Sequence, residues 1–272
     1  MQNFSTSPKE MVASFWRNRS LINTLVKRDV IGRYRGSFMG ILWSVLNPIF
    51  MLAVYTFVFS VVFQARWHAG SDSKTQFALM LFAGLLVFNL FSECINKAPS
   101  LIISNVNFVK KMVFPLESLP WVILGSALVH MAISLVVWLV FFISFFGIPP
   151  ATIFLFPVIL FPLVLLTMGI SWFLASVGVY LRDVSQVIGI VTTILLFLSP
   201  IFYPLSALPQ KYHGLFVLNP LTPVIEQTRD AMVSGKLPDA VFFAGYLAVT
   251  GMFAWLGFAW FQKTRKGFAD VL

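Results

Sequence analysis

The sequence is short of charged residues. Asp, Glu, Lys and Arg together make up 11% of its 272 residues, whereas hydrophobic residues make up 58%. Soluble domains carry nearer a quarter charged residues, so this composition argues against a soluble globular protein. It indicates instead that lipid surrounds much of the surface, since several apolar runs reach the roughly 20 residues that cross a bilayer.

Metal ligands and nucleotide-binding motifs are scarce as well. Cys94 is the one cysteine, which excludes an internal disulfide and a cysteine-based metal cluster. The three histidines, His68, His130 and His213, lie in different regions, and no His-Glu-x-x-His sequence occurs, so we predict no metal and no cofactor in this chain. The chain also lacks a Gly-x-x-x-x-Gly-Lys-Ser/Thr loop, which excludes ATP binding by that route.

Six apolar runs predict an all-α membrane protein with one transmembrane domain at 38–264. The spans are expected at about 38–64, 77–96, 120–147, 151–180, 186–204 and 240–262. Pro48 should kink the first span, because proline removes a backbone hydrogen bond. No cleavable signal peptide is expected, since the polar and basic lead before Phe38 is far longer than an n-region.

The distribution of Lys and Arg predicts the orientation of the spans. Six spans place both termini on one side of the membrane. Fourteen Lys and Arg residues lie on that side and five on the other. Positive charge stays inside, so both termini and the tail 265–272 are predicted to be cytoplasmic.

Two segments outside the spans are also informative. In the lead, 1–37, Met11, Val12, Phe15 and Trp16 recur at helical spacing between basic residues, which predicts one or two amphipathic helices at the cytoplasmic interface. A solvated basic lead that only sets topology is the alternative.

The outer segment 205–239 is long for a plain loop. Thr222-Pro223 predicts a helix start and Gly235 a stop, and 215–218 predicts a second short element. Two short re-entrant helices in the outer leaflet would imply a gate or cavity beneath them, because irregular backbone at membrane depth must be buried or line water. A surface loop with one helix is the alternative.

Ionisable residues inside the predicted spans are few. Glu93, near the cytoplasmic end of the second span, is a functional candidate by default, or it snorkels or pairs with a basic residue. His130, in the third span, can stay neutral and hydrogen-bond a neighbouring helix. Since no intramembrane carboxylates are paired, a transport function would draw its energy from a partner subunit.

Several motifs together resemble a known family. Residues 27–43 and the following Asn47-Pro48 are similar to the start of the permease subunits of type-2 ABC exporters for polysaccharides, which include O-antigen, capsule and teichoic acid exporters. Residues 107–120 resemble the coupling segment of that family, and 180–184 resemble one of its cytoplasmic turns. Residues 199–204 and 219–229 resemble its outer gate. The resemblance runs in order over nearly the whole chain.

The resemblance implies a transporter subunit with no catalytic residues and no ATPase site of its own. It implies a homodimer in the bacterial inner membrane with two ATPase subunits below it, which would bind ATP and Mg. It also implies that an undecaprenyl-linked polysaccharide, O-antigen above all, leaves the cytoplasm reducing end first through a pore between the two copies. Membrane lipids are expected partners, and nucleic acid is not.

Three other functions remain as alternatives. The first is export of another lipid-linked glycan, teichoic acid or a drug-like cargo. A membrane-embedded glycosyltransferase is a second, although its cytoplasmic acids would be isolated ones such as Glu117 and Asp183. The third, an ion-coupled carrier, is disfavoured because no internal repeat is visible.

Candidate site residues fall into four groups. In the loop 97–119, basic residues can pair with acidic groups of an ATPase and apolar ones can enter a groove. The ATPase-coupling candidates are Asn107, Lys110, Lys111, Val113, Phe114, Pro115, Arg182 and Asp183. A second group consists of Arg28, Asp29, Arg33 and Arg35, which are candidates for contact with lipid pyrophosphate, the ATPase subunit or anionic lipid. The three arginines suit phosphate, because a guanidinium group can donate two hydrogen bonds to it at once.

Aromatic side chains are candidates for a pore, because they can stack on the apolar faces of sugar rings. They share helical faces in the first two spans, although such stripes also pack against helices or lipid. The pore-lining candidates are Trp43, Tyr55, Phe59, Phe63, Phe88 and Phe91, with Phe50 and Phe57 on the stripe of Trp43. The gate candidates are Ser199, Pro200, Tyr203, Asn219, Pro220 and Arg229.

Overall fold

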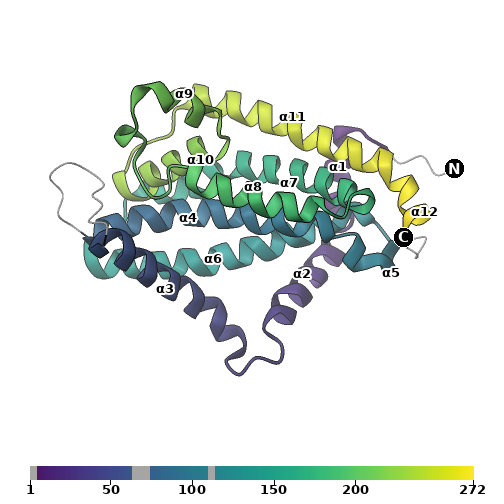
Figure 1. Cartoon of the computed structure of the whole chain (residues 1–272), viewed down its shortest axis with the longest axis horizontal. Helices are drawn as coiled ribbons and strands as arrows, with labels where there is room; N and C mark the ends of the chain where they lie inside the picture. The colour runs from purple at the N-terminus through teal and green to yellow at the C-terminus, as the bar shows by residue number, and fades with distance from the viewer. Residues whose placement is uncertain (1–4, 63–73, 110–113) are drawn as a thin grey trace.

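The computed structural model describes residues 5–62, 74–109 and 114–272, and the regular structure in these ranges is helical (Figure 1). Four segments are long and apolar enough to cross a membrane: Thr75–Ser100, Leu116–Phe146, Ala151–Tyr180 and Ala240–Val271. Two shorter apolar helices, Trp43–Thr56 and Val184–Leu198, accompany them. The chain is therefore a multi-pass membrane protein.

Each of the six predicted apolar runs contains a helix. These are α3 (Trp43–Thr56), α4 (Lys74–Lys97), α6 (Leu119–Phe146), α7 (Phe156–Tyr180), α8 (Val184–Leu198) and α11 (Ala240–Thr264). A π-helix (Phe57–Val62) continues α3, and Pro48 lies inside α3. The prediction that the fifth run extends to 204 is wrong, because Ser199 is extended before Pro200 and α8 ends at Leu198.

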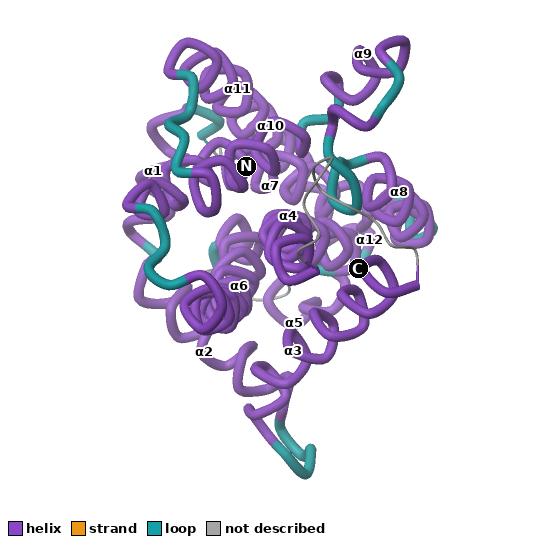
Figure 2. The backbone as a smooth tube through the Cα atoms, turned by 90° about the vertical axis from the view of Figure 1, so that its left-hand side faces the viewer, coloured by secondary structure: helices purple, strands orange, loops and turns teal. Residues whose placement is uncertain are grey.

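Helix α4 lies at the centre of the bundle, with α3, α6, α7 and α8 around it (Figure 2). In an apolar stretch of 18 residues within Thr75–Ser100, which contains most of α4, 83% of the residues are buried. The share is 11% in the span that contains α6 and 22% in the span that contains α11. The outer helices carry exposed apolar side chains such as Val136 and Val140 of α6. The apolar surface of α6 and α11 thus suits contact with lipid, whereas α4 is a core helix.

Helices α7 and α11 pack at backbone contact. A Cβ atom added to Gly257 would overlap the backbone of Gly169, and one added to Gly169 would lie 2.5 Å from the carbonyl oxygen of Phe253. Small residues permit such close approach of helices in membranes, where packing rather than burial from water drives association.

The lead forms two helices, α1 (Pro8–Arg17) and α2 (Arg19–Tyr34). In α2, Ile22 and Leu25 are buried against Val122 of α6, while Val12 and Trp16 of α1 are 62% and 65% exposed. Figure 1 shows α2 and α3 leaving the bundle as the two arms of a V. The predicted helical lead is thus present as two helices, each with one face against the bundle.

The outer segment also forms two short helices, α9 (Gln210–Leu218) and α10 (Leu221–Arg229), at the end of the bundle opposite the two termini (Figure 1). The predicted start of α10, with Thr222 as the N-cap and Pro223 as the first helical residue, is wrong: the helix begins at Leu221, whose N–H donates to the Asn219 side chain at 2.9 Å. The predicted stop is confirmed, since Gly235 has a φ of 70° after the π-helix Asp230–Ser234. Two further short helices, α5 (Val106–Val109) and α12 (Phe268–Val271), lie at the end of the termini.

Candidate functional site

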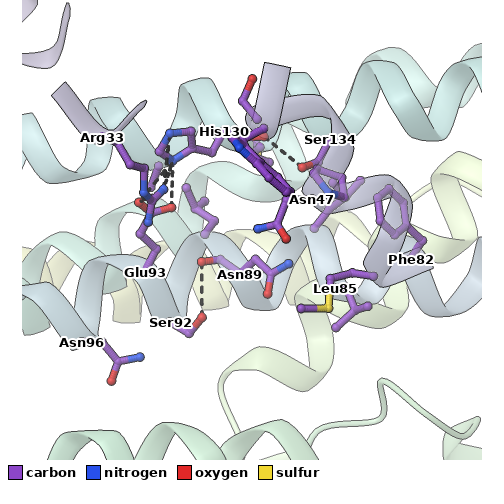
Figure 3. Close-up of a pocket in the computed structure, with 18 of the residues that line it drawn as sticks. Arg33, Asn47, Phe82, Leu85, Asn89, Ser92, Glu93, Asn96, His130 and Ser134 are labelled. Carbon is purple, nitrogen blue, oxygen red and sulfur yellow. Dashed lines mark hydrogen bonds and ion pairs between the residues drawn. The ribbon is translucent and has the colours of Figure 1, made fainter. Parts of the chain in front are cut away.

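A cavity of about 770 Å³ lies between the V formed by α2 and α3 and the helices α4 and α6 (Figure 3). Its walls combine one charged end, a row of amides and hydroxyls, and an apolar part. The apolar part includes Tyr55, Phe82 and Leu85, and the polar row includes Asn47, Asn89 and Ser134. The cavity therefore has charged, polar and apolar walls that suit a ligand with both polar and apolar parts.

Helix α4 opens to this cavity along a single polar strip. From Phe77 to Ile95 every side chain is buried except Asn89, Ser92 and Glu93. Asn96 and Lys97 continue the strip toward the end of the helix, and all five line the cavity. Residues spaced by three, four and seven share one helical face. The central helix of the bundle thus carries hydrogen-bonding groups on the face that the other helices do not cover.

The charged end of the cavity joins three helices. Glu93 of α4 lies 3.0 Å from Arg33 of α2 and 3.1 Å from His130 of α6. Lys97, one turn further along α4, lies 3.0 Å from Glu93 and 3.7 Å from Asp29. Figure 3 shows Arg33, Glu93 and His130 pointing toward one another. One carboxylate therefore holds three basic side chains, and the pairing expected for Glu93 is present.

His130 Nδ1 lies between a donor and an acceptor. It is 2.8 Å from Arg33 Nη1 and 3.1 Å from Glu93 Oε2. Nδ1 without a proton can accept from Arg33, and Nδ1 with a proton can donate to Glu93, but this nitrogen cannot do both at once. The cluster can thus exist in two hydrogen-bonding arrangements with the same side chains.

The gate candidates converge at the opposite end of the bundle. Arg229, 3% exposed, donates from Nε to the carbonyl of Met80 at 2.8 Å, from Nη2 to that of Ile201 at 2.7 Å, and from Nη1 to that of Pro200. The guanidinium thus ties α10 to α4 and to the turn after α8.

Other gate candidates reinforce this connection. Asn219 Nδ2 donates to Ser199 Oγ at 2.9 Å, and the Tyr203 hydroxyl donates to the Phe197 carbonyl at 2.7 Å. The Pro220 carbonyl accepts from the Tyr246 hydroxyl at 2.6 Å. Burial raises the pKa of the Glu226 carboxyl above its usual value, while the charge of Arg229 opposes that rise.

The remaining predicted site residues are dispersed rather than gathered in one place. Asn107 lies on α5, and Phe114 stacks on Phe108 at 4.2 Å, with the Arg28 guanidinium 5.9 Å from the Phe108 ring. Pro115 precedes a short 3-10 turn. Arg182 and Asp183 form the turn between α7 and α8, and Arg35 follows α2 as an exposed residue. Lys110, Lys111 and Val113 lie outside the described residues.

The pore-lining candidates divide into three groups. Trp43 and Tyr55 line the cavity, whereas Phe50 and Phe57 of the Trp43 stripe are 53% and 59% exposed and do not. Phe88 and Phe91, predicted to line a pore, are 6% and 3% exposed and belong to the core, so that prediction is wrong. Phe63 and the side chain of Phe59 lie outside what the structure describes.

Sequence reasoning missed the polar strip. Asn47, Asn89, Ser92, Asn96 and Ser134 were not predicted as site residues, although polar residues at 89, 92 and 96 in an apolar run share one helical face. That spacing was a usable signal. Within the described ranges, no three His, Cys, Asp or Glu side chains are grouped so as to hold a metal ion.

The apolar helices and the polar cavity among them define a multi-pass helical membrane protein with an internal polar site. The family model of the ABC-2 type transporter matches residues 20–233, so the chain belongs to that family. It is a transporter subunit without an ATPase domain, and permeases of this family function with ATPase subunits.

Three relatives show how widely the similarity extends. The O-antigen export system permease protein RfbA of Myxococcus xanthus is 28% identical over 96% of this chain and 99% of its own length. The protein of the same name from Klebsiella pneumoniae is 24% identical over 93% and 95%. The polysialic acid transport protein KpsM of Escherichia coli is 26% identical over 84% and 86%.

Proposed function

We propose that this chain is the permease of an ATP-driven exporter that moves a lipid-linked polysaccharide, most specifically an undecaprenyl-linked O-antigen, out of the bacterial cytoplasm. Two copies would enclose the path and two ATPase subunits would drive it. The observation that carries the proposal is the polar strip of α4, since a helix otherwise buried exposes amides and a charged end to a cavity.

The dimensions and chemistry of the cavity suit such a substrate. From Phe82 to Lys97 the helix rises roughly 22 Å, a large part of a hydrocarbon core of about 30 Å. The amides of Asn47 and Asn89 can both donate to and accept from sugar hydroxyls. Aromatic and aliphatic walls suit the apolar faces of sugar rings, and Arg33 and Lys97 suit a phosphate.

The choice of O-antigen rests on the relatives. Both RfbA proteins are named as O-antigen export permeases and cover more of this chain than KpsM, a polysialic acid transport protein. Capsule and teichoic acid are the alternatives in the same chemical class, and an export assay with each cargo separates them.

The proposed topology has six spans with both termini in the cytoplasm. Helices α1 and α2 would lie at the inner interface, which is supported by the basic residues of the lead and by the exposed Val12 and Trp16. Helices α9 and α10 would re-enter the outer leaflet as the gate, and they lie at the end of the bundle opposite the termini. Labelling of single cysteines placed at Lys9 and Lys236 in intact cells tests this, because only the second should react with an impermeant reagent.

The segment 97–119 is proposed to receive the movement of the ATPase subunit. Phe108 and Phe114 stack on each other beside Arg28, so this segment is held against the lead rather than extended freely. Reversing both charges at Lys110 and Lys111 should lower export per ATP hydrolysed, and normal export in that double variant would contradict the coupling role.

The decisive test of the proposed function is export itself. In cells lacking the native permease, wild-type protein should restore O-antigen at the surface, while Asn89→Leu and Asn47→Leu should lower it about tenfold by removing amide contacts. Asn23→Leu, an exposed position on α2 away from the cavity, is the control. Equal export by all variants would remove the cavity from the substrate path, and restoration of capsule or teichoic acid alone would change the cargo.

A further inference from the structure

A buried ion pair joins the end of the segment 97–119 to two other elements. Glu117 is 6% exposed and lies in the 3-10 turn Leu116–Ser118, directly before α6. Its Oε2 lies 2.6 Å from Arg265 Nη1, just beyond α11, and its Oε1 accepts from the Ser14 hydroxyl of α1 at 3.2 Å. The two side chains of the pair are 7% and 9% exposed. One carboxylate thus uses its two oxygens to hold two different helices.

The backbone of the same residue holds a third helix. The Glu117 carbonyl accepts from Trp172 Nε1 of α7 at 3.1 Å. Beside it, a row of rings crosses four helices: Phe15 of α1 lies 4.5 Å from Trp121, which lies 5.6 Å from Trp172, which lies 5.2 Å from Phe258 of α11. The start of α6 is therefore fixed to α1, α7 and α11 by directional bonds and by packing.

From this geometry we infer that Glu117 and Arg265 are positioning residues for ATP coupling, which pass a displacement of the segment 97–119 to α1 and to the end of α11 together. The inference rests on the proposed function, because it takes that segment as the contact of the ATPase subunit. A displacement entering at Pro115 reaches Glu117 after two residues. Since the carboxylate is bonded on both oxygens, α1 and α11 have to follow it.

The buried ion pair fixes the direction of the contact between these helices, which apolar packing does not. Replacing a buried ion pair by apolar residues often leaves stability unchanged, so stability alone does not account for the pair. Two bonds from one carboxylate fix direction as well as distance. A glutamine at 117 keeps the shape but has an NH2 donor in place of one carboxylate oxygen, so only one of the two positions that face Ser14 and Arg265 can still accept.

The test compares coupling with stability in the reconstituted complex with its ATPase subunits. The double variant Glu117→Gln/Arg265→Gln removes both charges of the ion pair, so no unpaired charge remains in the interior. We expect this variant to assemble and hydrolyse ATP, while polysaccharide exported per ATP falls at least about fivefold, the lower range of coupling effects between sites. The control is Glu10→Gln/Arg17→Gln, which removes an ion pair within α1 alone and should leave the ratio unchanged.

A second readout needs no substrate. Spin labels at Lys9 and Lys263, in a Cys94→Ala background, report the distance between α1 and α11. In the wild-type complex, the distance within each copy should have a narrow distribution with and without ATP, and in the double glutamine variant it should have a broad one when ATP binds. An assembled variant with a wild-type ratio and a narrow distribution would overturn the inference.

Two further outcomes are also decisive. If the double variant does not assemble, Arg265→Lys takes its place, because lysine keeps the charge but not the planar fork. If Arg265→Lys exports less polysaccharide per ATP than wild type, the inference is supported. If it exports as much per ATP as wild type, the inference is overturned. If the labels behave as expected while the wild-type complex moves no polysaccharide, the proposed function fails and the positioning role stands.

Discussion

Two arginines of the protein, Arg229 and Arg33, lie in opposite settings. Arg229, at the end of α9 and α10, is 3% exposed and donates to three backbone carbonyls. The Arg33 side chain, at the charged end of the cavity, is 44% exposed, and its partners Glu93 and His130 are side chains. The same residue type is thus bonded to the backbone in one place and to side chains in the other.

The difference separates a connection that is fixed by the backbone from a cluster of side chains that can exchange partners. A carbonyl can leave its donor only when the backbone moves, whereas a side chain can change partner by rotating. The outer arginine therefore acts as a fixed connection between α10, α4 and the turn after α8. The inner cluster can exchange partners with a ligand, since Arg33 and Lys97 already hold an anion that a phosphate resembles in charge.

The largest effect is expected for Arg229→Leu. Three buried carbonyls would lose a donor, at roughly 1–3 kcal/mol for each group left unsatisfied. The variant should unfold in detergent at a lower temperature than any variant of the cavity, and little of it should be folded in the membrane. Arg229→Lys should lie between it and wild type, because lysine keeps the charge without the planar fork. A wild-type unfolding temperature in Arg229→Leu would mean that this guanidinium is not what holds the outer end.

A smaller effect is expected for Glu93→Gln. The substitution removes the carboxylate that holds Arg33 and Lys97, and the loss should be about 1–2 kcal/mol because both partners are partly exposed. The unfolding temperature should fall less than in Arg229→Leu, while export falls with it. Glu10→Gln, which breaks an exposed pair within α1, is the matched control. If Glu93→Gln destabilised as much as Arg229→Leu, the contrast between the two ends would be lost.

Apolar runs predicted the helices well, because a helix that is surrounded by lipid or by other helices needs a long apolar run, which the sequence shows directly. The runs at 120–147 and 151–180 correspond to Leu119–Phe146 and to the turn and helix that end at Tyr180. Proline and glycine set some of the ends, as at Pro200 and Gly235. The start of α10 was missed by two residues, because the Asn219 side chain, rather than Thr222, accepts the first N–H.

The sites were less predictable, because a stripe of residues does not show what lies opposite it. Phe88 and Phe91 share one helical face, as residues of a pore-lining stripe would, but α4 is central, so they pack in the core. Arg33, Glu93 and His130 are far apart in sequence and meet only in the folded chain. The outer candidates were found by resemblance, and their contacts through Arg229 became visible only in three dimensions.

Arg33→Gln should alter stability still less. A pair with one partner 44% exposed contributes below about 1 kcal/mol, so the unfolding temperature should stay near that of wild type. Export should nevertheless fall severalfold if Arg33 meets the phosphate of the substrate. Arg19→Gln, which removes a guanidinium over Trp16 on the outside, should leave export unchanged. Equal export by the two variants would assign Arg33 to the structure alone.

The smallest effect is expected for Tyr55→Ala, measured beside Phe57→Ala. Tyr55 lines the cavity and lies 5.9 Å from the Phe202 ring, whereas Phe57 is 59% exposed and does not line it. An aromatic contact of about 0.5–1.5 kcal/mol corresponds to a twofold to tenfold loss of export, which we expect for Tyr55→Ala and not for Phe57→Ala. The two residues lie two positions apart in the chain and therefore at a similar depth in the membrane. The two variants thus compare a side chain that lines the cavity with one on the exposed face of the helix. If Phe57→Ala lowered export more, the path of the substrate would lie on the exposed side of α3.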